Sequence, residues 1–240
     1  QSKVGNTNVM AVIKADAYGH GALPIAKALS KSGVYGFCVA LISEIKELIQ
    51  GGIKEPILHL GRFSKENIEK LPSNQIRFTI NCINDIDVIK AFNATNKIIT
   101  HLKIDTGMGR MGIPYDDAIH IMKVLSETKT IKVEGVYSHF ATAEEEDKHY
   151  RDWQLERFNT IIEHTKNILP DTELFHIANS AAIFNCSNAH YNMVRPGLSL
   201  YGISPLGYPH DELEPVMTLK APIVMIKKIK SGDCVGYNCL

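Results

Sequence analysis

The stretch V-M-A-V-I-K at residues 9–14, followed at once by A-D-A-Y-G-H-G at residues 15–21, sets the pattern for most of the chain. A short apolar run ends in a lysine, and a loop with two glycines leads into a segment of helical period at residues 21–31. Short buried strands that alternate with amphipathic helices are typical of parallel sheets. This unit therefore predicts a β-strand with a crossover helix.

The same unit recurs along the chain. Apolar, β-branched runs that predict strands lie at residues 9–14, 35–40, 56–60, 76–80, 98–105, 133–139, 174–178 and 193–201. Segments of helical period lie between them, at residues 21–31, 43–50, 65–71, 86–92, 115–127 and 147–168. Eight such units that close on themselves form a (β/α)8 TIM-type barrel, which is the fold we predict. A doubly wound open sheet is the alternative.

The pattern changes near Pro205. The loop at residues 204–214 is rich in proline, glycine and acidic residues, and residues 216–229 then alternate as a β-strand does, without helical period. We therefore predict a barrel domain at residues 1–212 and the start of a second, all-β domain at residues 213–240. The missing initiator methionine and the apolar stretch that runs to Leu240 indicate a fragment.

Composition argues against several classes of partner. The chain has 26 basic and 26 acidic side chains and no basic run interleaved with aromatics, so we expect neither nucleic acid nor a membrane surface as a partner. A small neutral or zwitterionic substrate fits better. No run approaches the length of a membrane span and no signal peptide is recognised, so we expect a cytoplasmic protein.

The cysteines show no C-x-x-C pair and no spacing typical of a metal site. We expect free thiols in a reducing compartment and no bound metal. The five cysteines are Cys38, Cys82, Cys186, Cys234 and Cys239.

Polar residues end several predicted strands, and in a barrel the active site lies at the carboxyl ends of the strands. Lys14 is the sharpest case, because it follows a buried run and precedes a loop whose glycines allow close backbone approach to a ligand. A partly desolvated lysine is a better Schiff-base amine. The plainer interpretation is a strand-end lysine that reaches solvent. The other polar residues at or near strand ends are Lys103, Asp105, His139, His176, Asn179, Ser180 and Arg195.

The segment V-I-K-A-D-A-Y-G-H-G-A at residues 12–22 resembles the pyridoxal 5'-phosphate (PLP) motif of alanine racemases, which are fold-type III PLP enzymes. Four further segments resemble motifs of that family, in the family's order. They are H-L-K-I-D-T-G-M-G-R-M-G (101–112), Y-S-H-F-A-T-A (137–143), H-I-A-N-S-A-A (176–182) and V-R-P-G-L-S-L-Y-G (194–202).

The resemblance implies a role for each matching residue. Lys14 carries PLP as a Schiff base and is the base on one face of the substrate's α-carbon. Arg195 faces the pyridine nitrogen and leaves it unprotonated, because a guanidinium does not readily give up its proton. His139 orients Arg195 and the second base, a buried structural histidine being the alternative. The implied cofactor-binding residues are Lys14, Tyr18, His139, Asn179, Ser180, Arg195, Gly197 and Leu198.

Two more family roles concern charge. The resemblance places Arg110 beside the cofactor's phenolate oxygen and the substrate carboxylate. Lys103 matches a lysine that many members carry as a carbamate, whose negative charge holds the arginine in position. Without that modification the two cations repel each other.

Racemisation needs a proton donor or acceptor on each face of a planar carbon, so a second base is required. In the family this base is a tyrosine of the partner subunit in a V-S-Y-G-like segment. Here residues 235–238 read V-G-Y-N, which puts Tyr237 at that position with different neighbours. An ordinary strand tyrosine is the alternative. The resemblance implies a homodimer with two shared active sites.

The implied activity is PLP-dependent conversion of L-alanine to D-alanine for peptidoglycan. A serine racemase or a racemase of broad specificity on the same scaffold is one alternative, and a non-catalytic PLP-homeostasis protein is another. Such carriers are typically single-domain, so the β segment and Tyr237 argue against a carrier. A fold-type III decarboxylase is disfavoured by Arg195, because that group generally has a carboxylate at the pyridine nitrogen.

Overall fold

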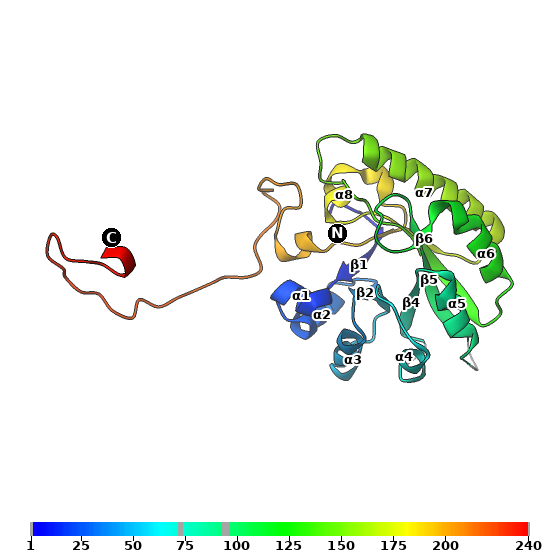
Figure 1. Cartoon of the computed structure of the whole chain (residues 1–240), viewed down its shortest axis with the longest axis horizontal. Coiled ribbons are helices and arrows are strands. Elements are labelled where there is room, and N and C mark those ends of the chain that lie inside the picture. Colours follow the sequence, from blue (N-terminus) through cyan, green and yellow to red (C-terminus); the bar gives the residue numbers. More distant parts are fainter. Residues whose placement is uncertain (1, 72–73, 93–96, 240) are drawn as a thin grey trace.

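The strands form a ring. The computed structural model describes residues 2–71, 74–92 and 97–239, and it shows eight parallel strands side by side in the order β8-β7-β5-β4-β3-β2-β1-β9 (Figure 1). A further short strand, β6 (Ile113–Pro114), pairs with β5. The predicted end points Gln1 and Leu240 lie outside the described residues. The ring strands are β1 (Asn8–Val12), β2 (Gly36–Val39), β3 (Ile57–His59), β4 (Ile76–Ile80), β5 (Ile98–Asp105), β7 (Ile131–Tyr137), β8 (Leu174–His176) and β9 (Met193–Val194).

The ring is completed between β8 and β9. The backbone N–H of Arg195 donates to the carbonyl of Ala178 at 2.9 Å, and the side chain of Asn192 accepts from the backbone N–H of Phe175 at 2.8 Å. β9 in turn pairs with β1, where Asn8 lies opposite Met193. The (β/α)8 barrel is confirmed and the open sheet is wrong.

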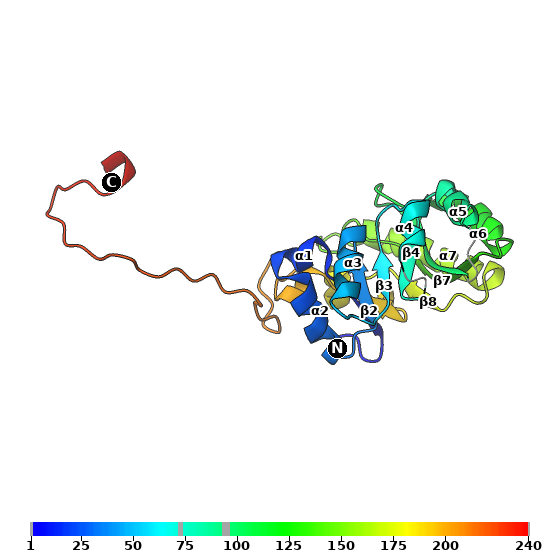
Figure 2. The ribbon, with the colours of Figure 1, turned by 90° about the horizontal axis from the view of Figure 1, so that it is seen from below.

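Helices lie outside the ring and follow the strands along the chain (Figures 1 and 2). The helices pack on the sheet through an apolar face, to which Ile45 and Leu48 belong on α3. The helices are α1 (Lys14–Gly19), α2 (Ala22–Lys31), α3 (Ile42–Gln50), α4 (Lys65–Glu69), α5 (Ile83–Lys90), α6 (Ala118–Ser126), α7 (His149–Ile168) and α8 (Ser180–Asn185). Among the described helices, none has both the length and the hydrophobicity that a membrane span needs.

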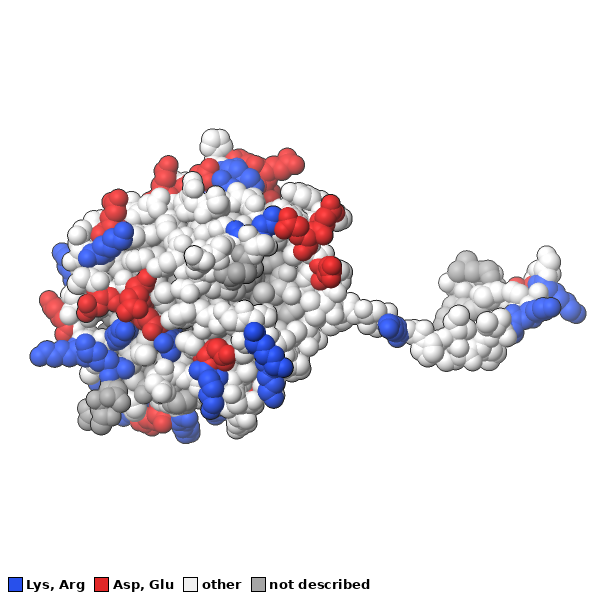
Figure 3. Space-filling view, turned by 180° about the vertical axis from the view of Figure 1, so that it is seen from behind, with Lys and Arg blue, Asp and Glu red and all other residues white. Residues whose placement is uncertain are grey.

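The strands are buried on both faces, as parallel strands covered by helices must be. In β1, Met10 and Val12 belong to a small cluster inside the ring, whereas Ala11 and the following Ile13 pack in the large cluster between strands and helices. This two-residue alternation decides which side chains point into the barrel. Over the face of the barrel seen in Figure 3, positive and negative side chains are interspersed.

The segment after the barrel differs from the prediction. Figures 1 and 2 show the chain leaving the barrel and running extended away from it. Within the described residues no strand lies between residues 216 and 229, where the sequence alternates as a strand does. An alternating segment forms a strand only when a neighbouring segment supplies hydrogen bonds. Among the described residues of this stretch only Val216 has such a bond, from its N–H to the carbonyl of Tyr201 at 3.2 Å. The second domain at residues 213–240 stays a prediction.

Two cysteines also differ from the prediction. Cys234 and Cys239 form a disulfide, so the expectation of five free thiols is wrong for this pair. The turn between them contains left-handed backbone at Gly236 and Asn238, which brings the two Cα atoms to 4.3 Å. The spacing of five residues is not a C-x-x-C motif, so no sequence pattern predicts this disulfide. The remaining cysteines, Cys38, Cys82 and Cys186, are free.

Candidate active site

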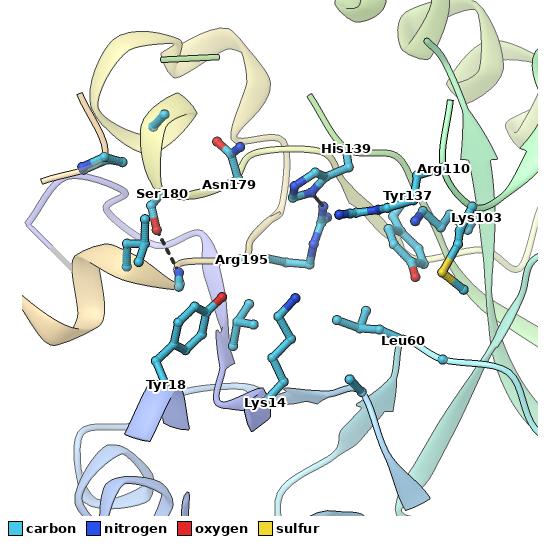
Figure 4. A pocket seen from close by; sticks show the side chains of 18 of the residues that line it. Lys14, Tyr18, Leu60, Lys103, Arg110, Tyr137, His139, Asn179, Ser180 and Arg195 are labelled. Atoms are coloured by element: carbon cyan, nitrogen blue, oxygen red, sulfur yellow. Dashed lines mark hydrogen bonds between the residues drawn. The ribbon is translucent and has the colours of Figure 1, made fainter. Parts of the chain in front are cut away.

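A cavity of about 500 Å³ opens at the carboxyl ends of the barrel strands. Lys14 follows β1, Lys103 lies near the end of β5, and Arg195 follows β9, so distant parts of the sequence meet in one place. Figure 4 shows Lys14 and Tyr18 pointing toward Arg195 on the opposite wall. Other lining residues include Leu60, Arg110, Met111, Tyr137, His139, Glu144, Asn179, Ser180, Gly197 and Leu198.

The segment labelled α1, which begins at Lys14, is a left-handed turn and not a right-handed helix. Ala15, Asp16, Ala17 and Tyr18 have φ between 52° and 56°, a conformation that costs a non-glycine residue about 1–2 kcal/mol. Strained backbone of this kind persists where surrounding groups determine it, and it concentrates at functional sites. The turn lets Lys14 and Tyr18, four residues apart, point into the same cavity.

The left-handed turn is held by a buried carboxylate on the next helix but one. Glu44 of α3 accepts hydrogen bonds from the backbone N–H groups of Ala15 at 2.5 Å, Ala40 at 2.8 Å and Leu41 at 2.9 Å. Asp16 closes the turn from its own side by accepting from the N–H of Ala22 at 2.6 Å. Glu44 thus ties the segment that carries Lys14 to the end of β2.

Small polar groups gather at one end of the cavity. The hydroxyl of Ser180 accepts from the N–H of Gly197 at 2.8 Å and from the N–H of Ser199 at 3.3 Å. A Cβ atom at Gly197 would lie 3.0 Å from the hydroxyl oxygen of Tyr18, so a side chain here would press on that hydroxyl. Backbone N–H groups and hydroxyls that converge in this way suit an anion such as a phosphate.

Arg195 is the buried centre of the opposite wall. Its Nη1 donates to Nδ1 of His176 at 2.7 Å and its Nη2 donates to the carbonyl of Ser138 at 2.6 Å. Nη2 also lies 3.2 Å from Nδ1 of His139. Among the described residues no group accepts a hydrogen bond from Nε of Arg195. A side chain that is 4% exposed and lines the cavity therefore keeps one donor for a ligand.

Positive charge dominates the cavity. Lys14, Lys103, Arg110 and Arg195 line it, and Glu144 is the one acidic side chain among the described lining residues. Burial, followed by the charges of Arg110 and Arg195, lowers the pKa of Lys103 from 10.5 to about 8. The cavity therefore favours the binding of anionic groups.

The histidines near Arg195 are neutral near pH 7. Burial and then the charge of Arg195 hold the pKa values of His139 and His176 well below the usual 6.5. A neutral imidazole can accept a hydrogen bond from a guanidinium, which a protonated one cannot. Both neutral rings can therefore orient Arg195 through hydrogen bonds and do not repel its positive charge.

Comparison with known proteins agrees with this geometry. Residues 1–205 match the sequence model of "Alanine racemase, N-terminal domain". The chain belongs to the alanine racemase family. An alanine racemase of Desulforamulus reducens is 38% identical over 244 residues, which cover 98% of this chain and 65% of that protein.

Solved structures of alanine racemases are similar as well. The structure of the Clostridium difficile alanine racemase has a TM-score of 0.86 at 34% identity, and the match covers 98% of this chain and 63% of that chain. The structure of the Bacillus anthracis alanine racemase with bound L-Ala-P has a TM-score of 0.83 at 32% identity, and the match covers 98% of this chain and 62% of that chain. The chain thus spans less than two thirds of the length of these alanine racemases.

Ten of the eleven site residues predicted from the sequence line the cavity. The exception is Tyr237, which is 95% exposed in the extended segment. The sequence analysis missed Tyr137 and Leu60 as lining residues. Tyr137 is the last residue of β7 and lies two residues before His139, so strand alternation could have found it. The predicted roles of these residues stay predictions.

Proposed function

We propose that this chain is the PLP-binding part of an enzyme that converts L-alanine to D-alanine. The observation that supports it best is the single cavity in which Lys14, Arg110 and Arg195 face one another at the end of an alanine racemase barrel. Cytoplasmic location and supply of D-alanine for peptidoglycan belong to the same proposal.

The cavity residues fit PLP. Tyr18, Ser180 and the backbone at Gly197 and Leu198 would hold the phosphate, with Asn179 beside them, and the free Nε–H of Arg195 would meet the pyridine nitrogen. Lys14 would hold the aldehyde carbon. PLP, when bound, supplies an electron sink that lowers the free energy needed to remove an α-proton.

Lys14 has a second task in this proposal. Its amine, released when substrate takes its place, removes or returns the α-proton on one face of the substrate. Arg110 binds the substrate carboxylate as a charge-assisted pair, which fixes the direction of the Cα–H bond. His139 is a positioning residue, because its Nδ1 accepts from Arg195 at 3.2 Å.

Proton exchange on the other face needs a second general acid–base group. We assign that task to Tyr237 of a partner subunit, because in this chain the tyrosine is 95% exposed and lies outside the barrel. The active protein is then a homodimer in which each barrel receives a tyrosine from the other subunit.

Lys103 is assigned as a carbamate. Its lowered pKa, about 8, leaves part of the amine neutral at pH 7–8, and the neutral amine is the form that adds to carbon dioxide. The nitrogen forms a bond to carbon, a proton goes to water, and the side chain becomes an anion. That anion would pair with Arg110, which otherwise faces a second cation.

The test is a measurement of D-alanine from L-alanine by the full-length protein with added PLP. We expect Tyr237→Phe to lower the rate by about 10²- to 10⁴-fold, as loss of a general acid–base group does. Tyr208→Phe is the matched control, since Tyr208 is also an exposed tyrosine beyond the barrel strands. D-serine formation without D-alanine would favour a serine racemase, and cofactor binding without racemisation would favour a PLP-homeostasis protein.

A further inference from the structure

A row of buried, hydrogen-bonded polar side chains, called the relay below, runs from Arg195 through the interior of the barrel. Its members are His176, His101, Glu134 and Arg77. Nε2 of His176 lies 2.8 Å from Nδ1 of His101, and Nε2 of His101 lies 3.3 Å from Oε2 of Glu134. Glu134 then binds Arg77 through two hydrogen bonds of 2.8 and 2.9 Å. None of these four residues except His176 contacts Arg195, and His101, Glu134 and Arg77 do not line the cavity.

Glu134 determines which atoms of the relay donate hydrogen bonds and which accept them. Burial alone would raise its pKa, but hydrogen bonds from His101 and Arg77 lower it to about 2. The carboxylate is therefore unprotonated and can only accept hydrogen bonds. Burial lowers the pKa of His101 from 6.5 and makes this ring neutral near pH 7, with one N–H.

These facts fix where each imidazole proton lies. Glu134 can only accept, so the proton of His101 is on Nε2 and its Nδ1 is an acceptor. His176 must then donate from Nε2, which leaves its own Nδ1 without a hydrogen. That bare nitrogen lies 2.7 Å from Nη1 of Arg195, which can only donate. Each contact from Glu134 through His101 and His176 to Arg195 therefore joins a donor to an acceptor.

We propose that Glu134 and His101 are positioning residues that set the tautomer of His176 and thereby hold Arg195 with its Nε directed into the cavity. The carboxylate at the far end of the relay determines a hydrogen bond two residues away. Naming the ligand of that Nε as the cofactor's pyridine nitrogen rests on the proposed function. The tautomers themselves do not.

The relay is buried, and neighbouring residues leave room for its rings and hold them in place. His101 and His176 are 0% exposed and Glu134 is 6% exposed. A Cβ atom at Gly135 of β7 would lie 2.8 Å from Cε1 and Nδ1 of His101, so only glycine leaves room for the ring. The ring of Tyr137 stacks on His176 at 4.8 Å and 5° and keeps its plane fixed. Replacing a polar member by an apolar side chain leaves a buried donor or acceptor unpaired.

The test uses a matched pair at one position in the full-length protein. His101→Asn keeps an acceptor oxygen near the place of Nδ1, and His101→Leu has nearly the same shape without it. Glu134→Gln puts an amide donor where the carboxylate accepts, and Glu173→Gln, at an exposed carboxylate, is its control. The readouts are the tautomer of His176, from two-bond proton–nitrogen correlations of ¹⁵N-histidine-labelled protein, and the Kd for PLP.

In the parent protein and in His101→Asn we expect His176 to carry its proton on Nε2. In His101→Leu and Glu134→Gln we expect a second population with the proton on Nδ1, and a Kd for PLP raised about tenfold because a charge-assisted hydrogen bond is lost. Urea unfolding identifies any variant that has lost the fold, and the remaining variants then carry the test.

An Nε2-protonated His176 in both His101→Leu and Glu134→Gln would overturn the proposal, and so would an Nδ1-protonated His176 in the parent. Absence of racemase activity would sink the proposed function and leave the tautomers, and hence this inference, to be judged by the nitrogen spectra alone.

Discussion

The barrel and the segment at residues 213–240 show two ways in which one chain carries functional residues. In the barrel, Lys14 and Arg195 are 181 positions apart in the sequence and line one cavity, because the ends of neighbouring parallel strands meet. In the segment, Val216 and Leu219 are exposed, and Tyr237 is 95% exposed. The barrel has its geometry fixed by its own contacts. Among the described residues of the segment only the first few contact the barrel region, as Val216 does by donating to the carbonyl of Tyr201 at 3.2 Å.

This difference separates two kinds of role. A group that must hold a cofactor rigidly is expected in the region that packs on itself, as Lys14 and Arg195 do. A group that acts across a subunit boundary can belong to a segment that gains its neighbours only in the assembly.

The first prediction separates cofactor binding from proton exchange. In the full-length protein, Lys14→Ala lowers racemisation by about 10²- to 10⁴-fold or more and also releases the cofactor, whereas Tyr237→Phe lowers turnover and leaves the cofactor bound. D-alanine formation and PLP content of the purified protein are measured together. Lys27→Ala, at an exposed lysine on α2, is the control for Lys14. Loss of PLP from Tyr237→Phe would contradict this division of roles.

The second prediction concerns stability. Phe78 is 1% exposed in the barrel, and Phe78→Ala is expected to lower the free energy of unfolding by about 3–5 kcal/mol, because it leaves a cavity. Val224 is 93% exposed, so Val224→Ala changes the same quantity by less than about 0.5 kcal/mol. Urea unfolding of the 240-residue chain measures both. Equal effects would mean that the segment packs as the barrel does.

The third prediction concerns the left-handed turn. Glu44→Gln removes the negative charge that accepts from Ala15, Ala40 and Leu41, and should lower the free energy of unfolding by about 1.5–3 kcal/mol. Glu47→Gln, at an exposed position of the same helix, should have no measurable effect. If the two variants unfold at the same urea concentration, Glu44 does not stabilise the turn.

The fourth prediction concerns pH. The folded protein lowers the pKa of Lys103 to about 8 from 10.5, so between these values the unfolded chain binds the extra proton. The free energy of unfolding therefore rises with pH across this window, by up to about 1.4 kcal/mol per pH unit from this group. In buffer free of carbon dioxide, Lys103→Met should lack that rise. Exposed Lys27→Met should retain it, and the same slope in both variants would show that Lys103 is not the source.

Much of the barrel could be predicted because strand composition and burial agree. The predicted strand at residues 98–105 coincides with β5, whose side chains are almost all buried. The predicted strand at residues 193–201 was too long, since β9 ends at Val194 and a 3-10 helix follows at Leu198–Tyr201. Pro196 lacks an N–H for a strand ladder, which explains the early end.

The site could be located from motifs, but its connections could not. Lys14 and Arg195 stand out in the sequence, whereas the relay from Glu134 to His176 joins residues on three strands and depends on ring orientations. The left-handed turn at residues 15–18 was also missed, because alanines and an aspartate give no signal for positive φ. Glu44, which holds that turn, lies 29 positions from Ala15 and looks like any helical glutamate.

The assignment of Lys14 can be tested by reducing the full-length protein with borohydride in the presence of PLP and mapping the modified peptide by mass spectrometry. We expect one phosphopyridoxyl group per chain, on Lys14, with none on Lys103 although both lysines line the cavity. Modification of another lysine with Lys14 unmodified, or no trapped cofactor in a folded protein, would contradict the assignment of this cavity as the PLP site.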